Sequence, residues 1–297
     1  NTSEDEIAVC NLGSVNLPNH LKENGELDEK KIESTVATAI RMLDNVIDIN
    51  YYAVPQAKNS NAKHRPIGLG LMGFQDALYI RKTPYASDEA VEFADNSMEM
   101  ISYYAIKSSS DLAKERGTYS SYEGSLWSQG IMPLDSISIV EDQRGEGYIE
   151  VDKSMKMDWN ALKKIVKTQG MRNSNVMAIA PTATIANITG LTQSIEPTYS
   201  NLFVKSNLSG EFTVINMHLV DALKEIDMWD EVMVYDLKNL NGSLEGINRV
   251  PEEIKKLFAT SFEVEPRWLI ESNSAIASMI SLSTIIKMLH EYLIELI

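Results

Sequence analysis

One short stretch, VMAIAPTATIANITG at positions 176–190, constrains the fold of this chain more than any other. Its first five residues are apolar without interruption, which is typical of a strand buried on both faces of a parallel sheet. Pro181 ends such a strand because it has no N–H group to donate to the ladder. The residues after it have helical potential up to Gly190, which can close a helix. The stretch therefore predicts a strand, a loop and a helix, a unit typical of α/β folds.

The loop between that strand and that helix is a candidate anion site. A strand that leads into a helix places free backbone N–H groups and the positive helix end at the carboxyl edge of the sheet, where α/β proteins bind phosphate. The residues concerned are Pro181, Thr182, Ala183, Thr184 and Ile185. The alternative for the same residues is an ordinary strand-to-helix loop capped by a threonine.

The charge of the chain limits its partners. It carries 27 Lys and Arg residues against 42 Asp and Glu residues, a formal net charge of −15. A surface this acidic repels polyphosphate backbones and anionic lipids, so we expect neither nucleic acid nor membrane as a partner. A small phosphorylated ligand is still compatible with it, because a cradle of backbone N–H groups acts locally. The longest apolar tract, positions 275–286, is about half of the roughly 20 residues that span a bilayer, which predicts no membrane span.

Cys10 is the single cysteine of the chain. One cysteine excludes an internal disulfide and every CxxC or Cys/His metal motif, and it favours a reducing, cytoplasmic compartment. The thiol could serve in redox chemistry near a positive helix end, or it could be a small buried hydrophobic residue. The first residues of the chain have no secretory signal, and the missing initiator Met leads us to expect that the numbering starts inside a longer product.

Apolar periodicity predicts the main elements. Residues 7–9 predict a buried strand that ends at Cys10, and residues 31–50 carry the stripe of an amphipathic helix. Ser87 and Gly117 are residue types that begin and end helices, which predicts one long helix between them. We expect further helices at 158–170, 217–226, 250–261 and from 268, and strands between 191 and 215. Strands that alternate with helices, without repeats or linkers, predict one compact α/β domain with a mainly parallel sheet.

The segment PIGLGLMGF spells GxGxxG with Gly68, Gly70 and Gly73. A dinucleotide fingerprint needs a buried strand before these glycines and an acidic residue about 20 positions on. Asp88 or Glu89 has about the right distance, but the preceding residues are polar and include Pro66, so no buried strand leads in. We therefore favour glycines that let a helix and a strand pack closely, with the fingerprint as the alternative.

Three other groups of residues have both a chemical and a structural interpretation. Glu196, in the SIEP turn, could take part in acid–base chemistry or simply be solvated. The pairs Tyr51–Tyr52 and Tyr103–Tyr104 could relay radicals, but core packing in helical surroundings is favoured. The four histidines lack HxH and HxxxH spacing, which disfavours a histidine metal site; they are His20, His64, His218 and His290.

Seven segments together resemble one family. They are EIAVCNLGSVNL, MLDNVIDINYYAVPQAKNSNAKHRPIGLGLMGFQDALY, YASDEAVEFADNSMEMISYYA, DLAKERGTYSSYEGSLWSQGI, MRNSNVMAIAPTATIANITG, SIEPTYSNLFVKSNLSGEFTV and FEVEPRWLIE. They are closely similar to the large, catalytic subunit of class I ribonucleoside-diphosphate reductase, from about Ser3 to Glu271. The resemblance implies the second half of a ten-stranded α/β barrel. It further implies that Cys10 is one of the two thiols that reduce the ribose, that residues 181–185 hold the substrate diphosphate, and that the GLGLMG glycines bind no nucleotide.

The chain departs from this family in ways that imply partners. It has no NLCxE motif for the radical cysteine and no second thiol, both of which lie upstream in the family. We expect a C-terminal-half piece, inactive alone, that needs an N-terminal half, a small radical-bearing subunit that holds the metal cofactor, and thioredoxin or glutaredoxin. This chain itself needs no cofactor. With them it would reduce ribonucleoside diphosphates to deoxyribonucleoside diphosphates for DNA synthesis.

The last 26 residues depart from the family and set the expected domain boundary. Residues 1–271 form the partial catalytic barrel and residues 272–297 an atypical apolar tail. The tail could form a helix over an exposed sheet edge or have no structural role; its helical spacing is carried by Ile285, Leu289, Leu293 and Leu296. Two other functions remain as alternatives, a nucleotide-dependent oxidoreductase built on the GLGLMG segment and a non-catalytic fragment that only binds an intact reductase.

Overall fold

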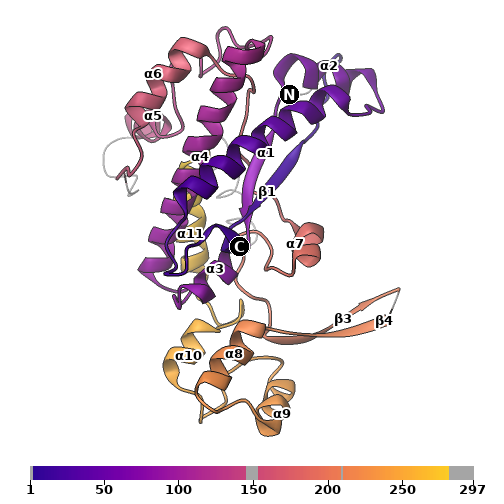
Figure 1. The fold of residues 1–297 in the computed structure, drawn as a ribbon, viewed down its shortest axis with the longest axis vertical. Helices are drawn as coiled ribbons and strands as arrows, with labels where there is room; N and C mark the ends of the chain where they lie inside the picture. The colour runs from indigo at the N-terminus through magenta and orange to yellow at the C-terminus, as the bar shows by residue number, and fades with distance from the viewer. Residues whose placement is uncertain (1–2, 145–152, 209, 281–297) are drawn as a thin grey trace.

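The computed structural model describes residues 3–144, 153–208 and 210–280 (Figure 1). Its strands are β1 (Leu12–Asn16), β2 (Gly68–Met72), β3 (Leu202–Asn207) and β4 (Gly210–Ile215). Its helices are α1 (Glu29–Ile49), α2 (Pro55–His64), α3 (Phe74–Ile80), α4 (Asp88–Arg116), α5 (Asp135–Arg144), α6 (Trp159–Gln169), α7 (Ala183–Thr189), α8 (Met217–Glu225), α9 (Glu231–Asn239), α10 (Glu252–Leu257) and α11 (Pro266–Ser278), with a 3-10 turn at Pro18–His20.

Three extended segments run side by side in the same direction. β1 and β2 pair in parallel, with Leu12 opposite Gly68. Beside β2, Met177 forms an isolated parallel bridge with Leu69, whose N–H group donates to the Val176 carbonyl at 2.9 Å. The predicted strand at 176–180 is therefore reduced to one bridge, and only its first two residues are buried. The mixed α/β class is confirmed, whereas the described residues do not close a barrel.

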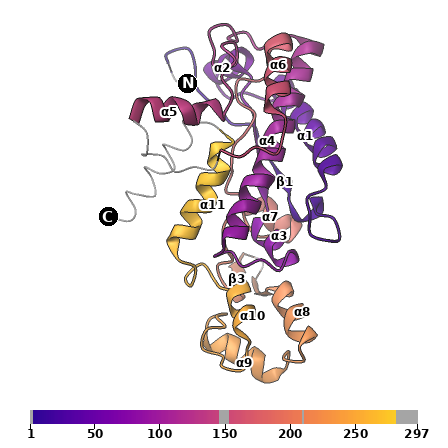
Figure 2. The ribbon, with the colours of Figure 1, turned by 90° about the vertical axis from the view of Figure 1, so that its left-hand side faces the viewer.

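The long helix α4 is the centre of the larger core. It packs against α1, α6 and α11, and Figure 2 shows α1 and α11 on opposite sides of it. Both predicted long helices are confirmed, and α4 begins and ends at the predicted Ser87 and Gly117. Ser87 accepts the Ala90 N–H at the start of α4, and Asp28 accepts the Lys31 N–H at the start of α1. Periodicity succeeded here because each helix buries one continuous apolar stripe.

A second, smaller core lies at one end of the molecule. Figures 1 and 2 show α8, α9 and α10 grouped there, and the antiparallel β3–β4 ribbon projects from it in Figure 1. Its buried side chains include Leu219, Leu223, Met233, Leu237 and Phe258. The predicted helix at 217–226 is confirmed as α8, while the one at 250–261 is shorter and α9 was not predicted.

The chain around Cys10 differs from the prediction. No named strand covers residues 7–9; β1 begins at Leu12, two residues after the thiol. Ile7 instead donates its N–H to the Gln56 carbonyl on α2 at 3.3 Å. Ile7 is a single bridge residue and residues 7 and 8 are exposed, so residues 7–9 are not the buried strand that the apolar run predicts.

A buried carboxylate links four segments of the chain. Asp44 on α1 is fully buried and accepts hydrogen bonds from Arg65 at 2.8 Å, Arg116 at 3.0 Å and Asn173 at 3.2 Å. Arg65 also binds Asp48, and that partnership lowers the Asp48 pKa. These bonds fix the turn at 172–173 that leads into the third parallel segment.

α11 runs across position 271, the expected boundary of the apolar tail, and Ser102 on α4 donates a hydrogen bond to the Met279 carbonyl at 2.7 Å. The helix expected from Ile285 onward lies outside the described residues. Across the described ranges, no helix is both long and apolar enough to cross a bilayer.

Candidate functional site

The loop at residues 181–185 leads into α7 with an unusual cap. Thr182 is the residue before the helix, is buried, and has a φ of 53°, in the left-handed region that a β-branched residue rarely adopts. Its hydroxyl oxygen does not cap α7; it accepts the N–H of Ser194 at 2.8 Å. The alternative of a loop capped by its threonine is therefore wrong. The first N–H groups of α7 keep no cap from Thr182, and Ala183 and Thr184 are exposed.

The chain that returns from α7 holds Thr182 in this conformation. We call residues 190–196 the return loop. Its Thr192 carbonyl accepts the Gly73 N–H at 3.1 Å, and its Ser194 carbonyl accepts the Phe74 N–H at 3.3 Å, so the loop caps α3. Further hydrogen bonds run in the opposite direction. Asp76, in the first turn of α3, accepts the Thr192 N–H at 2.7 Å and the Thr192 hydroxyl at 2.5 Å. The start of α3 thus anchors the loop that anchors Thr182.

A second set of contacts joins this region to α8. His218 Nε2 lies 3.5 Å from an Asp76 carboxylate oxygen, and its ring centroid lies 5.3 Å from that of Tyr79. Tyr79 shares a hydrogen bond of 2.7 Å with Thr198, and burial raises the Tyr79 pKa. Sequence reasoning missed Asp76, Tyr79 and His218, because their partners lie more than a hundred positions away.

Glu196 was considered for acid–base chemistry. It ends the return loop with an exposed side chain, although partial desolvation by the surrounding protein raises its pKa. The exposed side chain can still be reached by water, and no neighbouring charge contributes to the raised pKa. The position fits the solvated turn residue better than a catalytic acid.

Cys10 is exposed, which excludes the alternative of a small buried hydrophobic residue. The next residue, Asn11, is buried, and its carbonyl accepts the Gly68 N–H at 2.9 Å. The Asn11 side-chain nitrogen is buried without a hydrogen-bond partner in the described residues. An exposed thiol beside a well-fixed strand is accessible to a redox partner.

Strand register places the two predicted parts of the site toward opposite ends of the parallel segments. β1 and β2 pair from Leu12 and Gly68 onward, and the next residue of β2 bridges Met177. In this register Cys10 lies three positions before the level of Met177, whereas Thr182 lies five positions after Met177. The prediction that Cys10 ends a strand is wrong, whereas the roles predicted for Cys10 and for the loop stay predictions.

The glycines of the GxGxxG segment serve close packing. Gly68 and Gly70 lie inside β2, not in a loop after a strand. A Cβ atom on Gly70 would collide with the Ala178 carbonyl oxygen, and one on Gly68 would lie 2.7 Å from the Ala178 Cβ. Gly73 precedes α3 with a φ of 74°. The glycines admit the third parallel segment, so the geometry favours packing over a dinucleotide fingerprint.

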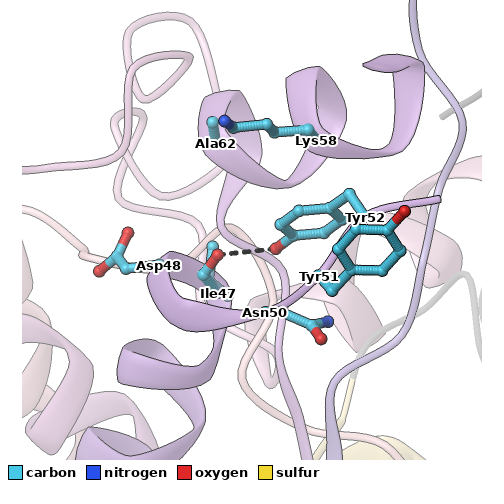
Figure 3. Close-up of a pocket in the computed structure, with 7 residues that line it drawn as sticks. All are labelled: Ile47, Asp48, Asn50, Tyr51, Tyr52, Lys58 and Ala62. Carbon is cyan, nitrogen blue, oxygen red and sulfur yellow. Dashed lines mark hydrogen bonds between the residues drawn. The ribbon is translucent and has the colours of Figure 1, made fainter. Parts of the chain in front are cut away.

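A hollow of about 340 Å³ lies where α1 ends and α2 begins (Figure 3). Its lining consists of Ile47, Asp48, Asn50, Tyr51, Tyr52, Lys58 and Ala62, and so includes no predicted site residue. Tyr51 is 88% exposed, so the prediction that this pair packs in the core is wrong for Tyr51. Tyr52 donates its hydroxyl to the Ile47 carbonyl at 2.7 Å.

The second tyrosine pair behaves as predicted. Tyr103 and Tyr104 lie within α4; Tyr104 is buried and donates to Glu29 at 2.7 Å, and Tyr103 meets Trp159 edge to face. Within residues 3–144, 153–208 and 210–280, no three or more His, Cys, Asp or Glu side chains are grouped so that they could hold a metal ion.

Comparisons with known proteins identify relatives over nearly the whole chain. The family model described as "Ribonucleotide reductase, barrel domain" matches residues 1–289. The ribonucleoside-diphosphate reductase subunit alpha of Chlamydia muridarum is 57% identical over 274 residues, which cover 92% of this chain and 26% of that protein. The large subunit of Danio rerio is 37% identical over 270 residues, covering 91% of this chain and 32% of that protein. The chain thus spans about a quarter to a third of the length of these relatives.

Proposed function

Because this chain belongs to the ribonucleotide reductase large-subunit family, we propose that it forms part of a catalytic barrel that reduces ribonucleoside diphosphates to deoxyribonucleoside diphosphates for DNA synthesis. The family match over nearly the whole chain carries this proposal. We assign the chain to the second half of a ten-stranded α/β barrel. The three parallel segments, each leading into a loop and a helix, are compatible with that assignment.

In this proposal the loop at residues 181–185 binds the substrate diphosphate. The Thr182 hydroxyl is engaged by Ser194, so it does not occupy the first N–H groups of α7. Those N–H groups can donate to phosphate oxygens, and a local cradle works in spite of the acidic chain. The strained backbone at Thr182 fits a geometry kept for a ligand, since nothing in the local sequence favours a positive φ there.

Cys10 supplies one of the two electron-donating thiols. Replacing the ribose 2′-hydroxyl by hydrogen releases water and takes two electrons, which a dithiol provides by forming a disulfide. The chain has one cysteine, so the second thiol comes from the protein part that the relatives carry outside the matched region. Thioredoxin or glutaredoxin then reduces the disulfide, and the exposure of Cys10 is compatible with a reducing, cytoplasmic setting.

The radical that starts the reaction comes from a small subunit that holds the metal cofactor. No cofactor is assigned to this chain. Its own residues bind the diphosphate, present the thiol and anchor both to the sheet. Alone it is inactive in this proposal, because neither the second thiol nor the radical is available.

Reconstitution tests the proposal. The chain is mixed with the separately expressed N-terminal half of the Chlamydia muridarum relative, the radical-bearing small subunit and a thioredoxin system, and deoxyribonucleoside diphosphate is measured. We expect product only when all parts are present. Product without the N-terminal half would refute the division of labour proposed here. Stoichiometric binding to an intact large subunit without any activity would support a non-catalytic fragment instead.

A further inference from the structure

Several hydrogen bonds hold the segment before Cys10 against α2. Besides the Ile7 contact to Gln56, the Asn59 side chain donates to the Asp5 carbonyl at 2.9 Å. The strongest tie is Glu6, whose two carboxylate oxygens meet Lys63 at 2.5 Å and His64 Nε2 at 2.6 Å. Residues 5–7 therefore lie fixed along the helix although they belong to no regular element.

Ser121 extends this tie to a third part of the chain. Its hydroxyl lies 2.6 Å from His64 Nδ1. We call Glu6, Lys63, His64 and Ser121 the Glu6 clasp. Each ring nitrogen of His64 therefore has one hydrogen-bonding partner, Glu6 at Nε2 and Ser121 at Nδ1.

Two members of the clasp, Glu6 and His64, are shielded more than an ordinary surface ion pair, whereas the Lys63 side chain is 48% exposed. The Glu6 and His64 side chains are only 13% and 14% exposed. The hydrogen bonds from Lys63 and then His64 hold the Glu6 pKa below its usual range, so the carboxylate is charged at neutral pH. Such hydrogen-bonded, partly shielded contacts fix geometry better than exposed pairs do.

Cys10 lies between the clasp and a second anchor. On the far side, the Asn11 carbonyl accepts the Gly68 N–H of β2. Only residues 8–10 lie between the two anchors, so the backbone that carries the thiol has little freedom. Disulfide formation requires the two Cα atoms to lie within about 4.4–6.8 Å of each other, so the position of this backbone decides whether exchange can occur.

We propose that the Glu6 clasp is a positioning device for the Cys10 thiol, with His64 as the positioning residue that links α2 and Ser121 to the cysteine segment. This inference rests on the redox role proposed for Cys10. The clasp does not touch the substrate. It fixes the sulfur at the amino-terminal edge of the sheet, where a second thiol and an external reductant can reach it.

A spin label attached to Cys10 tests the positioning directly. Because the chain has one cysteine, labelling needs no other substitution. We expect His64→Ala to shorten the rotational correlation time of the label at least about twofold, in the nanosecond range of loop motions. His64→Gln keeps one donor and one acceptor and should restore much of the order. Glu26→Gln, which removes an exposed carboxylate paired with Lys22, is the matched control and should change nothing.

The outcomes separate the clasp from the proposed function. A label as ordered in His64→Ala as in the unsubstituted chain, with an unchanged unfolding temperature, would overturn the clasp. If His64→Ala does not fold, Ser121→Ala takes its place. This variant removes only the hydroxyl that contacts His64 Nδ1, and the label must still move faster than in the unsubstituted chain. In the reconstituted enzyme we expect His64→Ala to lower kcat at least about tenfold, which is 1.4 kcal/mol, with little change in KM for the diphosphate. If His64→Ala loosens the label but the unlabelled, unsubstituted chain forms no product in the reconstituted mixture, the reductase proposal is overturned and the clasp is not.

Discussion

Thr182 gives the sharpest test of how the loop at residues 181–185 is built. Replacing it by valine keeps the shape of the side chain and removes the oxygen that accepts the Ser194 N–H. Thr182→Ser keeps that oxygen and removes only a methyl group. Thr189→Val is the matched control, since it removes an exposed hydroxyl from the same helix, α7.

The magnitude follows from burial. Ser194 is 4% exposed, so its N–H in Thr182→Val loses its partner without gaining water. An unsatisfied buried donor costs about 1–3 kcal/mol, and we expect this loss in the free energy of unfolding. Thr189→Val should stay within about 0.5 kcal/mol, as surface substitutions do. The same hydroxyl ties the residue before α7 to the return loop, so its loss should also weaken diphosphate binding. Each 1.4 kcal/mol of binding free energy that is lost lowers the affinity for the diphosphate about tenfold.

Urea unfolding followed by tryptophan fluorescence measures the stability, and titration calorimetry with a ribonucleoside diphosphate measures the affinity in the reconstituted protein. We expect Thr182→Val to lose both, Thr182→Ser to lose little of either, and Thr189→Val to lose neither. If Thr182→Val were as stable as the control, the hydrogen bond to Ser194 would not hold the loop. If stability fell and affinity did not, the loop would not be the diphosphate cradle.

Three further outcomes are expected. Asp44→Ala leaves the buried Arg65 without its buried carboxylate partner and should lower the free energy of unfolding in urea by about 3–5 kcal/mol, whereas Asp48→Ala, at a half-exposed partner of the same network, should cost clearly less. Cys10→Ser should abolish deoxyribonucleotide formation in the reconstituted enzyme without changing the unfolding temperature, because the thiol is exposed. The hydrogen bond from Arg41 lowers the Glu115 pKa to about 2. The stabilisation from this pair is therefore complete above the ordinary pKa of 4.5 and is lost as the pH falls through about 2. A carboxyl NMR titration should show a midpoint at about 2 for Glu115, and Arg41→Gln should move that midpoint upward.

Each of these has an outcome that contradicts it. Equal losses in Asp44→Ala and Asp48→Ala would show that the buried carboxylate is not the centre of the network. Normal product formation by Cys10→Ser would remove the thiol from the reaction. An ordinary midpoint for Glu115 in the unsubstituted chain would show that the pair with Arg41 does not persist in solution.

The long helices that apolar periodicity predicts are present in the structure. The apolar stripe of α1, and the stripe of α4 together with its capping residue Ser87, predicted both helices, because a helix that packs on one face repeats its apolar residues at the helical period. Strands were predicted less well. A short apolar run such as residues 7–9 fits a strand or a segment against a helix equally, and the hydrogen-bond partner that decides lies on α2, dozens of positions away.

The candidate site shows the same limit. A threonine before a helix predicts a cap, and only the fold reveals that Ser194 takes the Thr182 hydroxyl instead. The buried partners of Asp44 and the contacts of His64 come from separate helices and loops, so no local spacing could have indicated them. By contrast, Pro66 and the polar residues beside it correctly argued against a dinucleotide fingerprint at Gly68 and Gly70.

The central claim is that this chain supplies a diphosphate loop and one thiol to a reductase assembled with a second protein part. Single-turnover reduction in the reconstituted mixture, without external reductant, tests it most directly, since each turnover should convert Cys10 to a disulfide with that part. We predict deoxyribonucleoside diphosphate in proportion to the Cys10 disulfide found by mass spectrometry. Product formed while Cys10 stays a free thiol would contradict the account.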